Sequence, residues 1–164
     1  MVRVKRRYLV CEVIAGEEED TQLQNIKELD VYRAVSNAIS RAHGDYGMGL
    51  LKKSLNVKYL NIGTGMAFIR VRRGAQHLLQ TALAFVKKIG NTNVTMTTLH
   101  VAGTIRSCQK FLISFHKQHL PDFLRHCSTP EERLQVQRSI KAACEKVNMY
   151  KHHSESHGIE EDDS

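Results

Sequence analysis

Residues 55–72 read LNVKYLNIGTGMAFIRVR, two runs rich in Val, Ile, Tyr and Phe on either side of a short segment that contains two glycines. The runs Leu55–Asn61 and Met66–Arg72 have the composition of β-strands, and Ile62–Gly65 between them is typical of a hairpin connection. The sequence therefore predicts two antiparallel strands in the middle of the chain.

Before this hairpin, the sequence predicts one strand and one helix. Residues 2–14 alternate and are rich in Val, Leu, Tyr and Ile, which indicates a strand. Asp30 can cap a helix whose apolar residues recur at helical spacing from Val31 to Ala42, and Gly44 would close it. The glycines from Gly44 to Gly49 then indicate a loop.

After the hairpin, the pattern repeats with a second helix and a fourth strand. The stripe from Ala75 through Val86 to Ile89 predicts one helix that ends at Gly90, and Asn93–Val101 reads as a strand. The resulting order, β-α-β-β-α-β, belongs to the split-βαβ sheet of ferredoxin-like and RNA-recognition-motif-like α/β folds.

Two helices are expected to follow this sheet. Thr104 can cap the first, which should stop before Pro121, and Thr129-Pro-Glu-Glu132 has the residues of a helix start. We expect one α/β domain with C-terminal helices over residues 1–148. Residues 149–164 lose all periodicity and are expected to form a disordered acidic tail.

The chain is basic, and its charge is unevenly distributed. It has 164 residues, with 24 Lys and Arg against 17 Asp and Glu, a net charge of +7. Five carboxylates lie in residues 154–164 and four in Glu17–Asp20, so the rest of the chain is more cationic still. A polyanionic partner is the first hypothesis, and a basic protein without a nucleic-acid role is the alternative.

Several classes of protein do not fit. No apolar run approaches the roughly 18–20 residues of a membrane-spanning helix, and the basic start lacks the apolar region of a signal peptide. Four widely spaced cysteines without a CxxC pair indicate reduced thiols in the cytosol or nucleus.

Catalytic and metal sites find little support in the sequence. Among carboxylates outside the acidic stretches, only Glu12 and Asp45 are candidates for a divalent-metal nuclease, which needs several converging carboxylates. His116, His119, His126 and Cys127 lie close in sequence but lack the paired spacing of structural zinc sites. Solvated helix histidines are the favoured interpretation.

The basic residues are better organised than the acidic ones. On the first strand, Arg3, Lys5 and Arg7 should share one face. On the third strand, Ala67, Ile69 and Val71 should face the core, and Met66, Phe68, Arg70 and Arg72 the opposite side. Because these strands are neighbours in this topology, we expect the basic rows to merge into an RNA-binding face. The alternative is that C-terminal helices cover that face.

Recognition should depend on phosphates more than on stacking. Thr64–Val71 keeps the Gly, the Ala and one aromatic residue (Phe68) of the RNA-recognition-motif pattern but lacks the other two aromatics. A second anion site could form where Gly103 and Thr104 lead into a helix, with Arg106 and Lys110 on one face. The alternative there is an ordinary capped helix with two solvated cations.

Three stretches resemble the Pop-five ("processing of precursor RNA") family of small ribonuclease P and ribonuclease MRP subunits. They are Met1–Glu12, Lys58-Tyr-Leu-Asn with Thr64-Gly, and above all Thr98–Ile113, which reads TLHVAGTIRSCQKFLI. The likeness covers roughly residues 1–145, and it implies an RNA-recognition-motif-like fold with added helices.

The resemblance also implies a function. Members of the family are not enzymes. They bind and brace an RNA that cleaves precursor tRNA with its own magnesium, they meet precursor tRNA only indirectly, and they bind no cofactor themselves. It implies a nuclear and nucleolar location, ribosomal RNA processing in the MRP particle, no membrane contact, and partners that include a thirty-kilodalton TIM-barrel subunit and other particle proteins.

We therefore predict a non-catalytic subunit that binds ribonuclease P RNA and MRP RNA. The candidate phosphate contacts and the helix N-terminus are Arg3, Lys5, Arg6, Arg7, Arg70, Arg72, Arg73, Gly103, Thr104, Arg106 and Lys110, and Phe68 would supply limited stacking. Apolar surface on the first helix (Val31, Val35, Ile39) or on the C-terminal helices is expected to meet protein partners. The alternatives are a ferredoxin-like protein-interaction module without direct RNA contact, and the metal nuclease.

Overall fold

The computed structural model describes residues 5–16 and 26–126, together with 129–131, 133–134, 137–138, 140–142 and 145. The chain divides into two compact units, Met1–Thr104 and Ile105–Ser164. The predicted acidic tail lies outside the described residues, and the predicted domain boundary at residue 148 stays a prediction.

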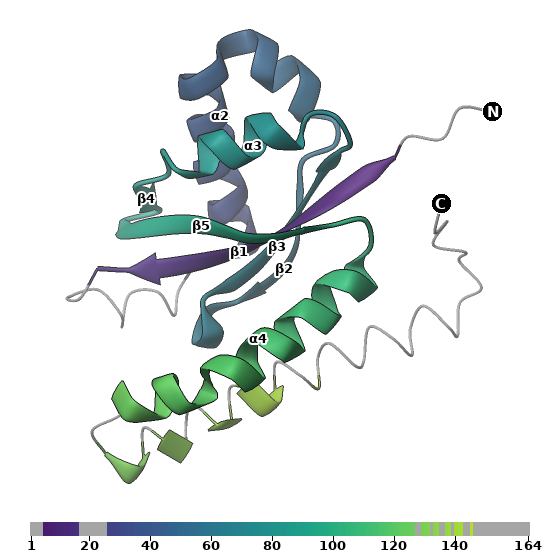
Figure 1. The fold of residues 1–164 in the computed structure, drawn as a ribbon. Coiled ribbons are helices and arrows are strands. Elements are labelled where there is room, and N and C mark those ends of the chain that lie inside the picture. Colours follow the sequence, from purple (N-terminus) through teal and green to yellow (C-terminus); the bar gives the residue numbers. More distant parts are fainter. Residues whose placement is uncertain are drawn as a thin grey trace. The chain divides into compact units, whose positions relative to one another are not determined.

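The first unit contains an antiparallel five-stranded sheet (Figure 1). Its strands stand in the order β2-β3-β1-β5-β4, so the first and third strands are neighbours, as the sequence predicts. The strands are β1 (Arg6–Ala15), β2 (Asn56–Asn61), β3 (Met66–Arg72), β4 (Lys88–Ile89) and β5 (Thr92–Ala102). The predicted α/β fold with a split-βαβ sheet is confirmed, with β4 as an additional short strand.

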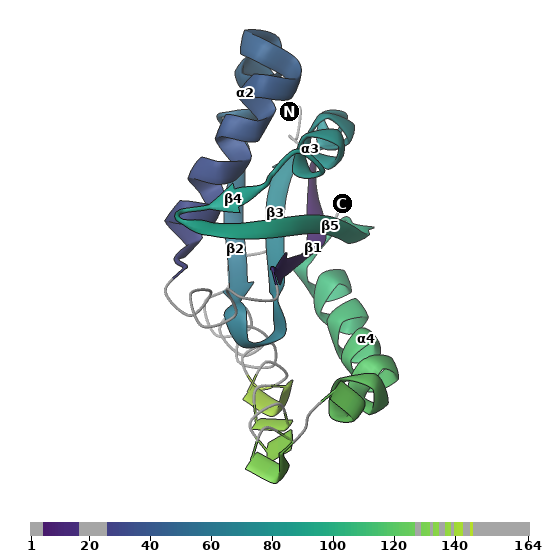
Figure 2. The ribbon, with the colours of Figure 1, turned by 90° about the vertical axis from the view of Figure 1, so that its left-hand side faces the viewer.

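The register between β1 and β3 separates the two faces of the sheet. Leu9 lies opposite Ile69 and Cys11 opposite Ala67, and all four belong to the main core. Because side chains alternate along a strand, Val10 and Phe68 face the other side. The helices α2 (Glu28–Leu51) and α3 (Gln76–Leu83) pack on the core face, as Figures 1 and 2 show.

Helix α2 differs from its prediction at both ends. It begins at Glu28, and Asp30 is not the cap but the third helical residue, whose carboxylate accepts a 3.1 Å hydrogen bond from the Lys27 backbone N–H. At its other end, Gly44 adopts φ 58° and ψ −154°, a conformation open to glycine that kinks the helix without ending it. The predicted loop after Gly44 is therefore wrong, and helical turns continue to Leu51.

Helix α3 is shorter than the apolar stripe that predicted it. It ends at Leu83, and Val86 and Ile89 reach the same core from the following connection and from β4. Gly90, with φ 60°, turns the chain so that Ile89 pairs with Thr92. The prediction of one helix over this range is wrong because the spacing of buried residues is helical while the backbone is not.

A histidine joins the two helices of the first unit. On α2, His43 lies one residue before the kink, and its Nε2 is 2.9 Å from the Leu78 carbonyl oxygen and 2.8 Å from Thr81 Oγ1, both on α3. This polar contact holds the C-terminal part of α2 against α3 and supplements the apolar packing of both helices in the main core.

The second unit begins with helix α4 (Ile105–His126). It continues through Pro121, so the predicted stop before that proline is wrong, although a proline inside a helix costs one backbone hydrogen bond. After residue 129, the described residues up to 145 are helical, consistent with the second predicted helix start at Thr129. In the described part of the chain, no helix is both long and apolar enough to cross a bilayer.

Helix α4 carries an unusual buried histidine. His116 is only 1% exposed, and neither of its ring nitrogens has a hydrogen-bond partner. Burial, reinforced by the nearby His119, lowers the pKa of His116 below its ordinary value. The folded chain therefore favours the neutral form of this imidazole.

Gly65 should tolerate no side chain. It follows the turn Ile62–Thr64 with φ 63°, its carbonyl accepts a 2.6 Å hydrogen bond from the Val13 N–H, and an added Cβ would lie 2.6 Å from the Val13 carbonyl oxygen. We expect Gly65→Ala to lower the free energy of unfolding by about 2–4 kcal/mol in urea denaturation.

Gly90→Ala is the matched control, because Gly90 has a similar φ but open space around its Cβ position. It should cost only about 1 kcal/mol. Equal losses for the two variants would show that the close approach of Gly65 to β1 contributes nothing to stability.

Acidification should destabilise the protein through His116. In the unfolded chain this histidine gains a proton below about pH 6.5, whereas its lowered pKa in the folded state delays that step. Its contribution to stability is therefore present above the unfolded pKa and is lost as the pH falls toward the folded pKa, by at most about 1.4 kcal/mol per pH unit.

Thermal melts as a function of pH test this expectation. His116→Leu should melt no lower than wild type at neutral pH and should show a weaker acid dependence, because it removes a buried polar group without partners. His77→Leu, at an exposed position of α3, should keep the wild-type acid dependence. A wild-type slope in His116→Leu would contradict the assignment.

Candidate nucleic-acid interface

Six basic residues gather where β1 begins and β3 ends. Arg6 lies directly opposite Arg72, Tyr8 opposite Arg70, and the Arg73 N–H donates a 2.8 Å hydrogen bond to the Lys5 carbonyl. We call this cluster the basic end of the sheet. Its members are Lys5, Arg6, Arg7, Arg70, Arg72 and Arg73.

The basic residues divide between the two faces of the sheet. Arg7 lies opposite Val71 and so belongs to the face that carries the helices, whereas Arg6 shares the other face with Arg70 and Arg72. The expected merging of an Arg3, Lys5 and Arg7 row with Arg70 and Arg72 is therefore wrong for Arg7. It is Arg6 that joins the second row, and Arg3 lies outside the described residues.

The basic end concentrates like charge without internal compensation. Directly opposed side chains on antiparallel strands lie about 5 Å apart, and like charges there are destabilising. Among the residues that the structure describes, no carboxylate forms an ion pair with any of the six cations. Four of them are exposed, while Arg7 and Arg70 are half-buried and Nε of Arg70 has no hydrogen-bond partner. The arrangement suits an external anion.

Phe68 is not presented to solvent. It is 2% exposed, and its ring centroid lies 4.7 Å from that of Tyr59 on β2. Val10 and Met66, on the same face, are fully buried. Stacking of Phe68 on a base stays a prediction that requires this ring to become accessible.

The glycine before the second unit lies beside the basic end. A Cβ on Gly103 would stand 3.5 Å from Nη1 of Arg7, so the structure brings these two predicted residues together. Thr104 follows and is half-buried. Arg106 and Lys110 are both exposed on the first turns of α4, four residues apart, in the second unit.

The two candidate carboxylates of a nuclease do not converge. Glu12 lies opposite Met66 on the sheet face away from the main core, whereas Asp45 is exposed on α2, which packs on the other face. No group of three or more His, Cys, Asp or Glu side chains within the described residues could hold a metal ion. The geometry gives no support to a protein-borne metal nuclease.

On α4, His116, His119 and Cys108 take part in packing in this structure. The His119 ring stacks on Phe115 with centroids 4.2 Å apart, and the His116 ring is buried, so the prediction of solvated histidines is wrong for His116. Burial also raises the pKa of Cys108 to about 12, which leaves its thiol unreactive at neutral pH. Cys127 lies outside the described residues.

The apolar residues expected to meet partners on the first helix are in the core instead. Val31, Val35 and Ile39 are at most 1% exposed and belong to the main core. The prediction is wrong because the helix turns its one apolar stripe toward the sheet. Exposed apolar side chains on α2 lie elsewhere, at Leu29, Tyr46 and Leu50.

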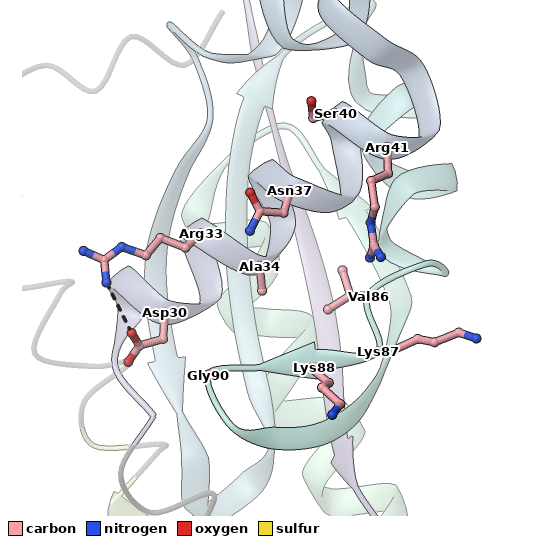
Figure 3. Close-up of a pocket in the computed structure, with 10 residues that line it drawn as sticks. All are labelled: Asp30, Arg33, Ala34, Asn37, Ser40, Arg41, Val86, Lys87, Lys88 and Gly90. Atoms are coloured by element: carbon pink, nitrogen blue, oxygen red, sulfur yellow. Dashed lines mark ion pairs between the residues drawn. The ribbon is translucent and has the colours of Figure 1, made fainter.

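A cationic groove that we did not predict runs between α2 and the segment around β4 (Figure 3). It has a volume of about 660 Å³, and its basic side chains are Arg33 and Arg41 from α2 and Lys87 and Lys88 from the other wall. The remaining lining residues are Asp30, Ala34, Asn37, Ser40, Val86 and Gly90. The sequence contains the signal as a polar α2 face at helical spacing and a Lys-Lys pair, but the spacing of Val86 and Ile89 predicts a helix for that pair.

Comparison with known proteins identifies relatives over most of the chain. The model of the Rpp14/Pop5 family matches residues 7–113. The protein named "Ribonuclease P/MRP protein subunit POP5" from Danio rerio is 38% identical over 146 residues, 85% of each chain. The Homo sapiens protein of the same name is 34% identical over 88% of this chain and 90% of its own length. "Ribonuclease P protein component 2" of Methanosphaerula palustris is 28% identical over 66% of this chain and 62% of its own.

The matched range begins within the basic end of the sheet and includes all of Thr98–Ile113, the stretch that carries most of the resemblance in the sequence. Two findings identify the same family. The family model covers well over half of the chain, and relatives are more than 30% identical along most of their length. The chain belongs to the Rpp14/Pop5 family.

Proposed function

We propose that this protein is a non-catalytic subunit of the ribonuclease P and ribonuclease MRP ribonucleoproteins, in which it binds and braces the catalytic RNA. Its relatives are named as ribonuclease P/MRP subunits. The observation that carries the proposal is the basic end of the sheet, where Arg6 faces Arg72 and no described carboxylate compensates either of them. Such a cluster is stabilised when phosphates neutralise it.

The contact is expected to position RNA rather than to read its sequence. Four of the six cations of the basic end are exposed and suit phosphate oxygens, and the one aromatic residue predicted to stack on a base is buried. Exposed Arg106 and Lys110 on α4 are further phosphate contacts in this proposal. Recognition would then follow the shape of a folded RNA.

The proposed role leaves the chemistry to the RNA. Cleavage of precursor tRNA, and of ribosomal RNA precursors by the MRP particle, would use magnesium bound by the RNA, and this chain would meet precursor tRNA only indirectly. We further propose a nuclear and nucleolar location and a thirty-kilodalton TIM-barrel subunit among its protein partners.

Removing the opposed arginines should weaken RNA binding without weakening the fold. We expect Arg6→Ala/Arg72→Ala to bind the ribonuclease P RNA of the same organism less tightly, with a slope of log K against log salt smaller by about one for each lost contact. The free energy of unfolding should stay equal or rise, because a like-charge pair is removed. Filter binding across a KCl series and urea denaturation measure the two quantities.

Lys52→Ala/Lys53→Ala is the matched control. It removes the same charge from two exposed positions directly after α2, neither of which belongs to the basic end of the sheet. If RNA affinity and salt slope fall equally in both double variants, the loss of net charge alone explains the weaker binding. An unchanged affinity in Arg6→Ala/Arg72→Ala would contradict the proposed surface and favour a protein-interaction module.

A further inference from the structure

The groove between α2 and β4 is a second concentration of positive charge, remote in sequence from the basic end of the sheet. Arg33 and Arg41 lie two turns apart on α2, and Lys87 and Lys88 lie on the facing wall (Figure 3). The single carboxylate in the lining, Asp30, is 4.0 Å from Arg33. Within the described residues, the groove therefore keeps three basic side chains without an acidic partner.

Two hydrogen bonds to backbone carbonyl groups hold the walls of the groove in place. Nη2 of Arg41 donates a 3.3 Å hydrogen bond to the Phe85 carbonyl, which ties α2 to the connection that leads into β4. The Val94 N–H donates a 2.9 Å hydrogen bond to the Lys87 carbonyl, which anchors the second wall to β5. The two lysine side chains are thus presented from an ordered backbone, and both are exposed.

The neutral lining fits a nucleotide chain better than an acidic peptide. Asn37 and Ser40 offer amide and hydroxyl groups between the two arginines, which suit ribose hydroxyls and phosphate oxygens. Arg guanidinium groups match phosphate geometry with two parallel hydrogen bonds. Buried Val86 forms an apolar floor, and the preceding residue, Phe85, is 57% exposed.

Phe85 is an exposed aromatic residue, whereas all six members of the basic end of the sheet are Lys or Arg. The backbone carbonyl of Phe85 accepts the hydrogen bond from Arg41, and Phe85 directly precedes the lining residue Val86. Exposed aromatic residues combined with a cationic groove are the means by which proteins hold single-stranded nucleic acid, since each base has a face that can stack. We infer that the groove lined by Arg33, Arg41, Lys87 and Lys88 binds the backbone of a single-stranded RNA segment, with a base stacked on Phe85. The inference rests on the proposed function and assigns it a second, separate contact surface.

Charge reversal in the groove tests the assignment with the full-length chain. The probe is a fluorescein-labelled oligouridylate, and the readout is fluorescence anisotropy across a KCl series. Lys87→Glu/Lys88→Glu should weaken binding by about tenfold or more relative to Lys52→Glu/Lys53→Glu, which makes the same charge change at exposed positions outside the groove. Its salt slope should also be smaller by about 1.4, for two lost contacts with a single strand.

A second variant separates stacking from charge. Phe85→Ala leaves all four cations in place, so it should weaken binding to oligouridylate while the salt slope stays that of wild type. With 4-thiouridine in the probe, photocrosslinks should fall on the peptide that contains Phe85–Lys88. Circular dichroism confirms that each variant is folded.

Equal oligouridylate affinities for Lys87→Glu/Lys88→Glu and Lys52→Glu/Lys53→Glu would overturn the assignment. An acidic protein segment would then be the favoured ligand of the groove. A Phe85→Ala variant that binds like wild type would overturn the stacking contact. Failure of the proposed function is distinguishable, because then wild-type protein would bind neither the oligouridylate nor the ribonuclease P RNA. If RNA binding weakens only in Arg6→Ala/Arg72→Ala and not in the groove variants, the proposed function stands and the assignment of the groove as an RNA contact is overturned.

Discussion

The antiparallel pairing of β1 with β3 determines where every other part of the first unit can lie. It sets Leu9 against Ile69 and Cys11 against Ala67, which gives α2 and α3 a continuous apolar surface to cover. The same register sets Arg6 against Arg72 at the open end of the pair. A slip of one residue would exchange the two faces, exposing the core residues and burying arginines, so packing and charge placement are fixed together.

Because the β1–β3 register fixes the positions of these arginines, the repulsion at the basic end of the sheet is a constant feature of the fold. Cross-strand like charges cost about 0.2–1 kcal/mol each, and simple substitutions would relieve that cost without touching the core. Among the described residues, no carboxylate offsets the repulsion within this cluster of six cations. In the proposed function, the phosphates of a folded RNA neutralise this cluster.

Patterns within one strand or helix were readable from the sequence, whereas relations between elements were not. The hairpin and the alternation of Ala67, Ile69 and Val71 follow from local spacing, and the structure confirms them. The side on which Arg7 lies depends on its partner Val71 across the ladder, which no single strand reveals. Val86 and Ile89 continue the helical spacing of α3 although they lie outside it. Because this spacing predicts a helix there, it gives no indication that Lys87 and Lys88 form a wall of the groove.

The central claim is that the basic end of the sheet contacts RNA in the assembled particle. Ultraviolet crosslinking with mass spectrometry on the purified particle tests it most directly, because it locates each nucleotide adduct on the chain. The account predicts adducts on the peptides that contain Lys5–Tyr8 and Arg70–Arg73 and none at Lys52 and Lys53. Protein–protein crosslinks at those two peptides, without nucleotide adducts, would contradict it.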